Sequence, residues 1–191
     1  MATFERAIPT TLLHEGRYVD DKSDSGQATN YGISLRFLRQ VGDLDHDGWP
    51  DGDIDKDGHI NARDIQLLKK DEAIRLYRLT FWDKNGYEKI ADQFVATKIF
   101  DLAVNMGSYQ ANKVAQRAVR SVVGIILVED GHIGLKSITA LNMCKPDRLL
   151  PALKSEASAI YRMIVARNAK MEKYLEGWLT RAYSNIILTT D

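Results

Sequence analysis

The sequence predicts a mainly α-helical fold of the α+β class for this chain of 191 residues. Apolar residues recur at helical spacing through most of the chain after residue 65, which indicates a helical majority. A stretch at 16–33, rich in Gly, Asp and Ser, carries two short apolar pieces, which favours a small β-hairpin. With 45% hydrophobic and 27% charged residues, the chain can bury a core and stay soluble. Its apolar runs are far shorter than the ~20 residues that span a bilayer, so no transmembrane segment is expected.

The N-terminal part is expected to hold one helix followed by the hairpin. Thr3 can cap this helix, and Gly16 would end it. Pro9 lies inside it and predicts a kink or a late start. The pieces at 18–19 and 31–33 would then pair as the hairpin.

Helices are expected through the rest of the chain, and we place them near 34–38, 65–68, 73–81, 93–104, 114–122, 151–170 and 174–186. Ser34 can cap the first of these, and in helix 93–104 the core candidates are Phe94, Ile99, Leu102 and Ala103.

The chain shows no repeat and no flexible linker, and the nearest candidate for a boundary lies at 84–92. We therefore expect a lobe at 1–90, which includes an acidic loop at 43–64, and a helical region at 91–191 packed on it.

The zero net charge conceals this strongly acidic segment. Between residues 43 and 64, eight Asp oppose one Lys and one Arg, which gives −6 and leaves +6 for the remainder. A basic body suits an anionic polymer as partner, although charges that merely solvate helix faces would give the same pattern. The single Cys144 excludes an internal disulfide and a cysteine-based zinc cluster.

The strongest short motif is a calcium-loop pattern at 53–64. Oxygen ligands recur at the spacing that a hard cation needs, and Gly58 permits the sharp turn at the sixth position. The expected metal ligands are Asp53, Asp55, Asp57, the backbone carbonyl of His59, Asn61 and Asp64. The run 53–69 resembles one repeat of a dockerin-type calcium loop with its helix. We expect Ca²⁺ as a structural cofactor.

Two alternatives stay open for the acidic stretch. It could be a solvated loop without metal, although so many close carboxylates repel one another without a counterion. A second match begins at Asp43 but fails at its twelfth position, which is Ile54. A partial second site that shares Asp51 or Asp53 stays possible. Paired loops of the EF-hand type are absent, which disfavours a signalling protein.

A candidate catalytic constellation comprises Glu15, Asp24 and Thr29. A carboxylic acid at a helix end, facing a carboxylate and a hydroxyl from a hairpin, supplies what glycoside hydrolysis needs. One carboxyl group protonates the leaving oxygen, while the second group positions water or stabilises positive charge. By spacing alone these residues could equally be helix caps and turn residues.

The segments 13–21 and 24–34 together resemble the signature of glycoside hydrolase family 108, a family of N-acetylmuramidases. The resemblance implies that Glu15 is the catalytic acid, in a lysozyme-like fold. Arg17, Ser25 and Gln27 depart from the family pattern, but none replaces a carboxylate or Thr29. The Glu–Asp–Thr spacing is also similar to the triad of phage-type lysozymes of family 24.

Later segments continue the resemblance, at 71–77, 81–83, 100–107, 130–139 and 177–181. The segment 130–139 resembles the turn of a helical peptidoglycan-binding region. The acidic loop lies where members of the family vary.

Candidate substrate-binding residues are Tyr18, Tyr31 and Asn105. Aromatic rings can stack on sugar faces, and Asn105 could bind an N-acetyl group or satisfy a buried backbone group. Tyr77 and Trp82 could also stack on sugars, but their helical spacing favours core packing.

The resemblance implies an endolysin or lysozyme that hydrolyses the β-1,4 bond between N-acetylmuramic acid and N-acetylglucosamine of bacterial peptidoglycan. The N-terminus lacks the features of a secretory signal peptide. We therefore expect a phage enzyme that stays in the host cytoplasm until a holin releases it to the periplasm and cell wall. We expect a monomer and no nucleic-acid partner.

Three other functions stay open. A muramidase that assists protein secretion would share the same chemistry. A non-catalytic peptidoglycan-binding or dockerin-like module would bind the wall without cleaving it, and the intact Glu15 argues against this. An amidase or peptidase would release amines in place of reducing ends, but the metal-ligand and nucleophile motifs expected for one are missing.

Overall fold

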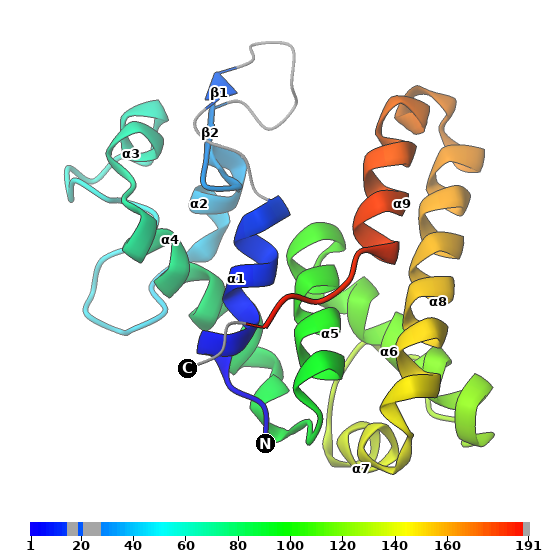
Figure 1. The fold of residues 1–191 in the computed structure, drawn as a ribbon. Helices are drawn as coiled ribbons and strands as arrows, with labels where there is room; N and C mark the ends of the chain where they lie inside the picture. The colour runs from blue at the N-terminus through cyan, green and yellow to red at the C-terminus, as the bar shows by residue number, and fades with distance from the viewer. Residues whose placement is uncertain (15–18, 21–27, 189–191) are drawn as a thin grey trace. The chain divides into compact units, whose positions relative to one another are not determined.

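The computed structural model describes residues 1–14, 19–20 and 28–188. It confirms a mainly helical fold with a small antiparallel sheet (Figure 1). Contacts divide the chain into two compact units, which we call the sheet unit (Thr11–Thr80) and the helical unit (Met1–Thr10 with Phe81–Asp191). Helix α1 passes from one unit into the other. The expected division at residue 90 stays a prediction.

The sheet unit contains β1 (Val19–Asp20), β2 (Ala28–Asn30), β3 (Ile33–Ser34), α2 (Leu35–Val41), α3 (Ala62–Leu67) and α4 (Lys70–Tyr77). The helical unit contains η2 (Tyr87–Lys89), α5 (Gln93–Met106), α6 (Ser108–Val123), α7 (Leu135–Met143), α8 (Pro146–Arg167), η3 (Ala169–Tyr174) and α9 (Leu175–Tyr183). Both α1 (Phe4–His14) and the π-helix η1 (Arg78–Asp83) span a boundary between units. No helix within the described residues is long and apolar enough to cross a membrane.

The strands form a three-stranded antiparallel sheet in the order β1-β2-β3, with one strand more than the expected hairpin. Thr29 on the central strand pairs with Val19 on one side and Ser34 on the other. Ser34 then caps α2, because its side chain accepts a hydrogen bond from the backbone N–H of Phe37 at 3.1 Å. The predicted cap is confirmed, and it directs the chain from β3 straight into α2.

The core of the helical unit is built on α5, which packs on α6 and α8, while α8 packs on α9 (Figure 1). Four aromatic rings meet edge to face at centroid distances of 5.5 to 6.1 Å, and they belong to Phe4, Trp82, Tyr87 and Phe100. Trp82 is 2% exposed, which confirms that it packs in the core. Edge-to-face pairs contribute beyond their buried area, so this cluster stabilises the unit.

Several helix boundaries and one core residue differ from expectation. Phe94 is 43% exposed, because it lies in the first turn after the capping residue Asp92, away from the buried face. Ile99, Leu102 and Ala103 are fully buried, as predicted. The long helix begins at Pro146 and not at 151, since proline is favoured at the first helical position.

A buried charge cluster joins α5 to α9. The carboxylate of Asp101 accepts hydrogen bonds from the Arg181 guanidinium at 3.0 and 3.2 Å. The ammonium of Lys98 donates to the backbone carbonyl of Arg181 at 2.8 Å. Asp101 and Lys98 are 0% exposed, and Arg181 is 7% exposed. Burial of the Lys98 ammonium lowers its pKa from 10.5 to about 8, although the Asp101 charge opposes this shift.

We expect this lysine to make stability rise with pH. Because the pKa of Lys98 is lowered in the folded state, the unfolded chain binds more protons between pH 8 and 10.5. The free energy of unfolding should therefore rise across that window, by about 3 kcal/mol from this group. Urea denaturation between pH 7 and 11 should show this rise in the wild type and not in Lys98→Met.

The matched control is Lys136→Met, which removes an exposed lysine from α7. The free energy of unfolding of this variant should change with pH as it does in the wild type. Equal profiles for Lys98→Met and the wild type would assign the rise to other groups.

Candidate functional site

The predicted catalytic residues fall only partly within the described chain. Glu15, Asp24 and Tyr18 lie outside the described residues. Thr29 lies in the middle of the central strand β2, and Tyr31 lies in the turn between β2 and β3. The sheet therefore brings two of the expected site residues to the same strand and turn.

The turn after β2 has an unusual backbone. Asn30 pairs with Ile33, and the two residues between them, Tyr31 and Gly32, have φ values of +50° and +75°. Positive φ at both central residues is typical of a type I′ turn, whose twist matches that of the strands. A bulky residue such as Tyr31 rarely adopts this conformation. The Tyr77 hydroxyl donates a hydrogen bond to the Tyr31 carbonyl at 2.8 Å and so supports the turn.

The Asn30 side chain connects this strand to α3. Its amide nitrogen donates to the backbone carbonyls of Ile65 at 3.1 Å and Leu68 at 3.2 Å. The last carbonyls of a helix have no partner within the helix, and each costs about 1–3 kcal/mol if it is buried without one. Asn30 supplies both hydrogen bonds from a single amide group. The role of Asn30 could not be predicted from the sequence, because its partners lie 35 and 38 residues away.

Two acidic loops follow α2, and they share one backbone design. We call them the first acidic loop (43–51) and the second acidic loop (53–64). In each, the carboxylate of the first Asp accepts from the N–H groups of the fifth and sixth residues, at 2.8 to 3.2 Å. The fourth residue has a φ near +60° and the sixth residue, a glycine, near +90°. A residue other than glycine would be strained at position 58, which agrees with the glycine that the motif requires at its sixth position.

The second acidic loop brings three predicted ligands together. One carboxylate oxygen from each of Asp53, Asp55 and Asp57 lies within 4.8 Å of the others. Asp64 is fully buried, but its two oxygens accept from the N–H groups of Ile54 and Asn61, at 2.8 Å each. Asp64 thereby closes the loop and caps α3. The His59 carbonyl accepts from the Asn61 side chain at 3.1 Å.

The first acidic loop gathers a second triad that the spacing rule alone did not establish. Asp43, Asp45 and Asp51 also place carboxylate oxygens within 4.8 Å of one another. Asp51, the ninth residue, accepts from the N–H of Leu44, the second residue, as Asp64 does in the other loop. The sequence left open a partial second site that shares Asp51, and the structure shows that Asp51 closes this loop from position nine in place of twelve.

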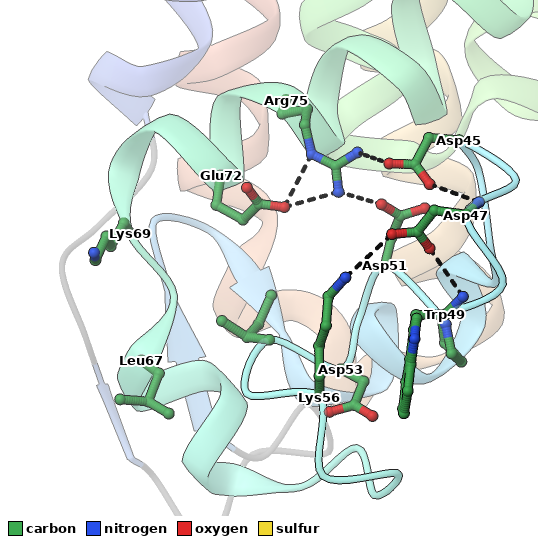
Figure 2. A pocket seen from close by; sticks show the side chains of 12 residues that line it. Asp45, Asp47, Trp49, Asp51, Asp53, Lys56, Leu67, Lys69, Glu72 and Arg75 are labelled. Carbon is green, nitrogen blue, oxygen red and sulfur yellow. Dashed lines mark hydrogen bonds and ion pairs between the residues drawn. The ribbon is translucent and has the colours of Figure 1, made fainter.

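Basic side chains already pair with carboxylates of the first acidic loop. Arg75 of α4 donates to Asp45, Asp51 and Glu72, and Lys56 reaches Asp47 at 3.1 Å (Figure 2). Burial disfavours the charged form of Arg75, but its hydrogen bonds to Glu72 and Asp51 outweigh this, and its pKa is raised. Hydrogen bonds from the Trp49 N–H and from Lys56 hold the pKa of Asp47 below its usual value.

A groove of about 520 Å³ lies between the two loops and α4 (Figure 2). Its lining comprises Asp45, Asp47, Trp49, Pro50, Asp51, Asp53, Ile54, Lys56, Leu67, Lys69, Glu72 and Arg75. Gly52 joins the loops against α2, where an added Cβ would lie 2.1 Å from the Leu38 carbonyl oxygen. The close approach of backbones at Gly52 fixes both loops relative to α2.

The donor chemistry of the second acidic loop fits a hard divalent cation. Three carboxylates converge, and all the expected ligands are oxygens. Arg63 pairs with Asp55 at 3.0 Å, but Arg63 is 70% exposed and can move into solvent. Such a cation would relieve the repulsion among the carboxylates.

Asn105 belongs to the helical unit, on α5. Its side-chain oxygen accepts a hydrogen bond from the Tyr161 hydroxyl at 2.6 Å. The Tyr161 ring in turn stacks on Trp178, with centroids 5.4 Å apart. The side-chain oxygen of Asn105 therefore orients the buried Tyr161. Sugar binding by Asn105 stays a prediction. Tyr77 is 1% exposed, so it packs in the core as expected.

Comparisons with known proteins match both parts of the chain. The model of a family described as glycosyl hydrolase 108 matches residues 8–107. A model described as a predicted peptidoglycan domain matches residues 110–183. A solved structure, titled as that of Brucella abortus SagA, has 22% identity and a TM-score of 0.62, with 96% of this chain and 98% of that chain covered. At this identity it supports the fold. No curated protein matches the chain.

Proposed function

This chain belongs to the glycosyl hydrolase 108 family, and we propose that it hydrolyses the β-1,4 bond between N-acetylmuramic acid and N-acetylglucosamine of peptidoglycan. The observation that carries the proposal is the order of the two matched regions. A glycosyl hydrolase region at 8–107 is followed directly by a predicted peptidoglycan domain at 110–183. A hydrolase joined to a region of this kind implies that the polymer is both the binding partner and the substrate.

Glu15 is the general acid of the proposed reaction. It protonates the glycosidic oxygen as the bond to the anomeric carbon breaks, and water completes the hydrolysis. Asp24 and Thr29 orient this water or stabilise the developing positive charge. The position of Thr29 on the central strand of the sheet supports its role, since both neighbouring strands hold it. A rigid strand suits a group that must place a water molecule.

Mass spectrometry of purified peptidoglycan after digestion tests this function. We expect disaccharide peptides that end in reducing N-acetylmuramic acid. Anhydro ends would assign a lytic transglycosylase, and new amines would assign an amidase or peptidase. Binding to the wall without any cleavage, with or without calcium, would leave a binding module and overturn the proposal.

We also propose that the second acidic loop holds a structural calcium ion, with Asp53, Asp55 and Asp57 as ligands and the His59 carbonyl and Asp64 completing the site. The convergence of the three carboxylates and the matching calcium-loop motif support this. Bound calcium would supply the positive charge that relieves repulsion among the carboxylates. The hydrogen bonds of Asp53 and Asp64 to backbone N–H groups hold the loop in shape.

Calcium should therefore stabilise the folded chain. A ligand present at 100 times its dissociation constant adds about 2.7 kcal/mol to the free energy of unfolding. We expect calcium chloride to raise the melting temperature and a chelator to reverse the change. Asp53→Asn should lose this response, because the first position of the motif takes only a carboxylate and the change replaces it by a neutral amide.

The matched control is Asp71→Asn, which makes the same change at an exposed position of α4. It should keep the full response to calcium. A wild type whose melting curve is the same in calcium and in chelator would remove the metal from the proposal.

A further inference from the structure

Helix α3 is held at both ends by side chains. Its six residues are too few to form a stable helix without outside contacts. At its N-terminus, Asn61 and Asp64 form a reciprocal capping box, and Asp64 also closes the second acidic loop through the N–H of Ile54. At its C-terminus, Asn30 from β2 donates to the carbonyls of Ile65 and Leu68.

The same amide group positions the hairpin. Asn30 directly follows Thr29 in β2 and begins the turn that contains Tyr31. Both acceptors of its side chain are carbonyl oxygens, so only the NH₂ group can make these bonds. On the following residue, the Tyr77 hydroxyl holds the carbonyl of Tyr31 at 2.8 Å. The turn is thus held at two consecutive residues: the side chain of Asn30 donates to α3, and the carbonyl of Tyr31 accepts from the Tyr77 hydroxyl.

We propose that Asn30 is a positioning residue that ties the strand carrying Thr29 to α3, and that it thereby couples the second acidic loop to this hairpin. The path runs from the loop through Asp64 to α3, and from the end of α3 through Asn30 to β2. All of its members lie within the sheet unit. The catalytic consequence rests on the proposed hydrolase activity, whereas the coupling rests on the proposed calcium site alone.

The kinetic test uses Asn30→Asp, which keeps the shape of the side chain but replaces its donor by acceptors. Displacement of Thr29 should lower kcat on peptidoglycan about 10- to 100-fold, with a smaller change in KM. Tyr77→Phe removes the hydroxyl that donates to the Tyr31 carbonyl, and it should also lower kcat, to a smaller extent. A purely structural role would lower the melting temperature and leave kcat unchanged well below it.

The matched control is Asn142→Asp. Asn142 also donates its side-chain amide to a backbone carbonyl, that of Lys89 at 3.1 Å, but it lies in the helical unit. This variant should keep the wild-type kcat and KM.

The coupling test measures hydrogen exchange of the chain with calcium chloride and with chelator. In the wild type, calcium should slow exchange of the amides in 53–67 and also in 28–34. In Asn30→Asp, calcium should still protect 53–67 but should no longer protect 28–34. Asn142→Asp should behave as the wild type does.

The outcomes separate this inference from the proposed function. Equal protection of 28–34 in the wild type and in Asn30→Asp would overturn the coupling, and so would protection of neither segment by calcium. Wild-type kcat in both Asn30→Asp and Tyr77→Phe would overturn the positioning role. A wild type that binds peptidoglycan and does not cleave it would overturn the proposed function, while the exchange experiment would still decide the coupling.

Discussion

Replacing Glu15 by glutamine should lower kcat for the hydrolysis of peptidoglycan by about 10²- to 10⁴-fold. General acid catalysis contributes a factor of this size, and an amide of the same shape has no proton to give to the leaving oxygen. The release of reducing ends from purified peptidoglycan measures the effect. Binding of the variant to the polymer should be unchanged, because the change removes a proton donor and keeps the volume of the side chain.

A matched control lies on the helix that precedes this residue. Glu5 is an exposed carboxylate near the start of α1, so Glu5→Gln makes the same chemical change in the other unit. It should hydrolyse peptidoglycan at the wild-type rate. Full activity in Glu15→Gln would place the general acid at another carboxyl group. Equal losses in both variants would point to folding as the cause.

The local features of the fold could be predicted from the sequence because they depend on neighbouring residues. The cap formed by Ser34, the sharp turn at Gly58 and the helix that buries Ile99 each follow from a pattern within a few residues. The three converging carboxylates of the second acidic loop follow from alternation in one short segment. Phe94 was placed wrongly, because helical spacing does not determine which face the first turn buries.

The features that could not be predicted depend on residues distant in sequence. Asn30 finds its two acceptors only after β2 and α3 have come together. The first acidic loop closes through Asp51 because its backbone N–H bonds to the carbonyl of Gly42 at 2.7 Å, which shortens the loop. Arg75 reaches Asp45 across 30 residues. The calcium-loop motif describes loops that close at the twelfth position, so it cannot predict these contacts.

Replacing Asp101 by asparagine should lower the free energy of unfolding at pH 7 by about 3–5 kcal/mol, the usual loss when one partner of a buried ion pair is removed. Asp101 is the acidic member of a cluster with the two buried cations Lys98 and Arg181. Its second oxygen, Oδ2, has no hydrogen-bond partner among the described residues, so an amide there would bury a donor without an acceptor. Urea denaturation measures the loss.

An exposed ion pair provides the control. Lys89 lies 3.9 Å from Glu88, with side chains 63% and 43% exposed, so Lys89→Met should change stability by less than about 1 kcal/mol. Losses of similar size in Asp101→Asn and Lys89→Met would contradict the assignment of a stabilising role to the buried cluster.

The loss in Asp101→Asn should also depend on pH, which separates lost charge from lost packing. Asp101 raises the pKa of Lys98, so its removal lowers that pKa further and widens the window in which the folded state holds a neutral lysine. At pH 7 the variant bears the cost of burying Lys98 and Arg181 without an anion. Above pH 10.5, Lys98 is neutral in both the folded and unfolded states, and only the lost partner of Arg181 counts.

The difference in unfolding free energy between the wild type and Asp101→Asn should therefore shrink as the pH rises from 7 to 11. When both proteins carry Lys98→Met, the difference should already have its high-pH value at pH 7, because only the lost partner of Arg181 then counts. A packing defect would instead keep the same size at every pH and in either background.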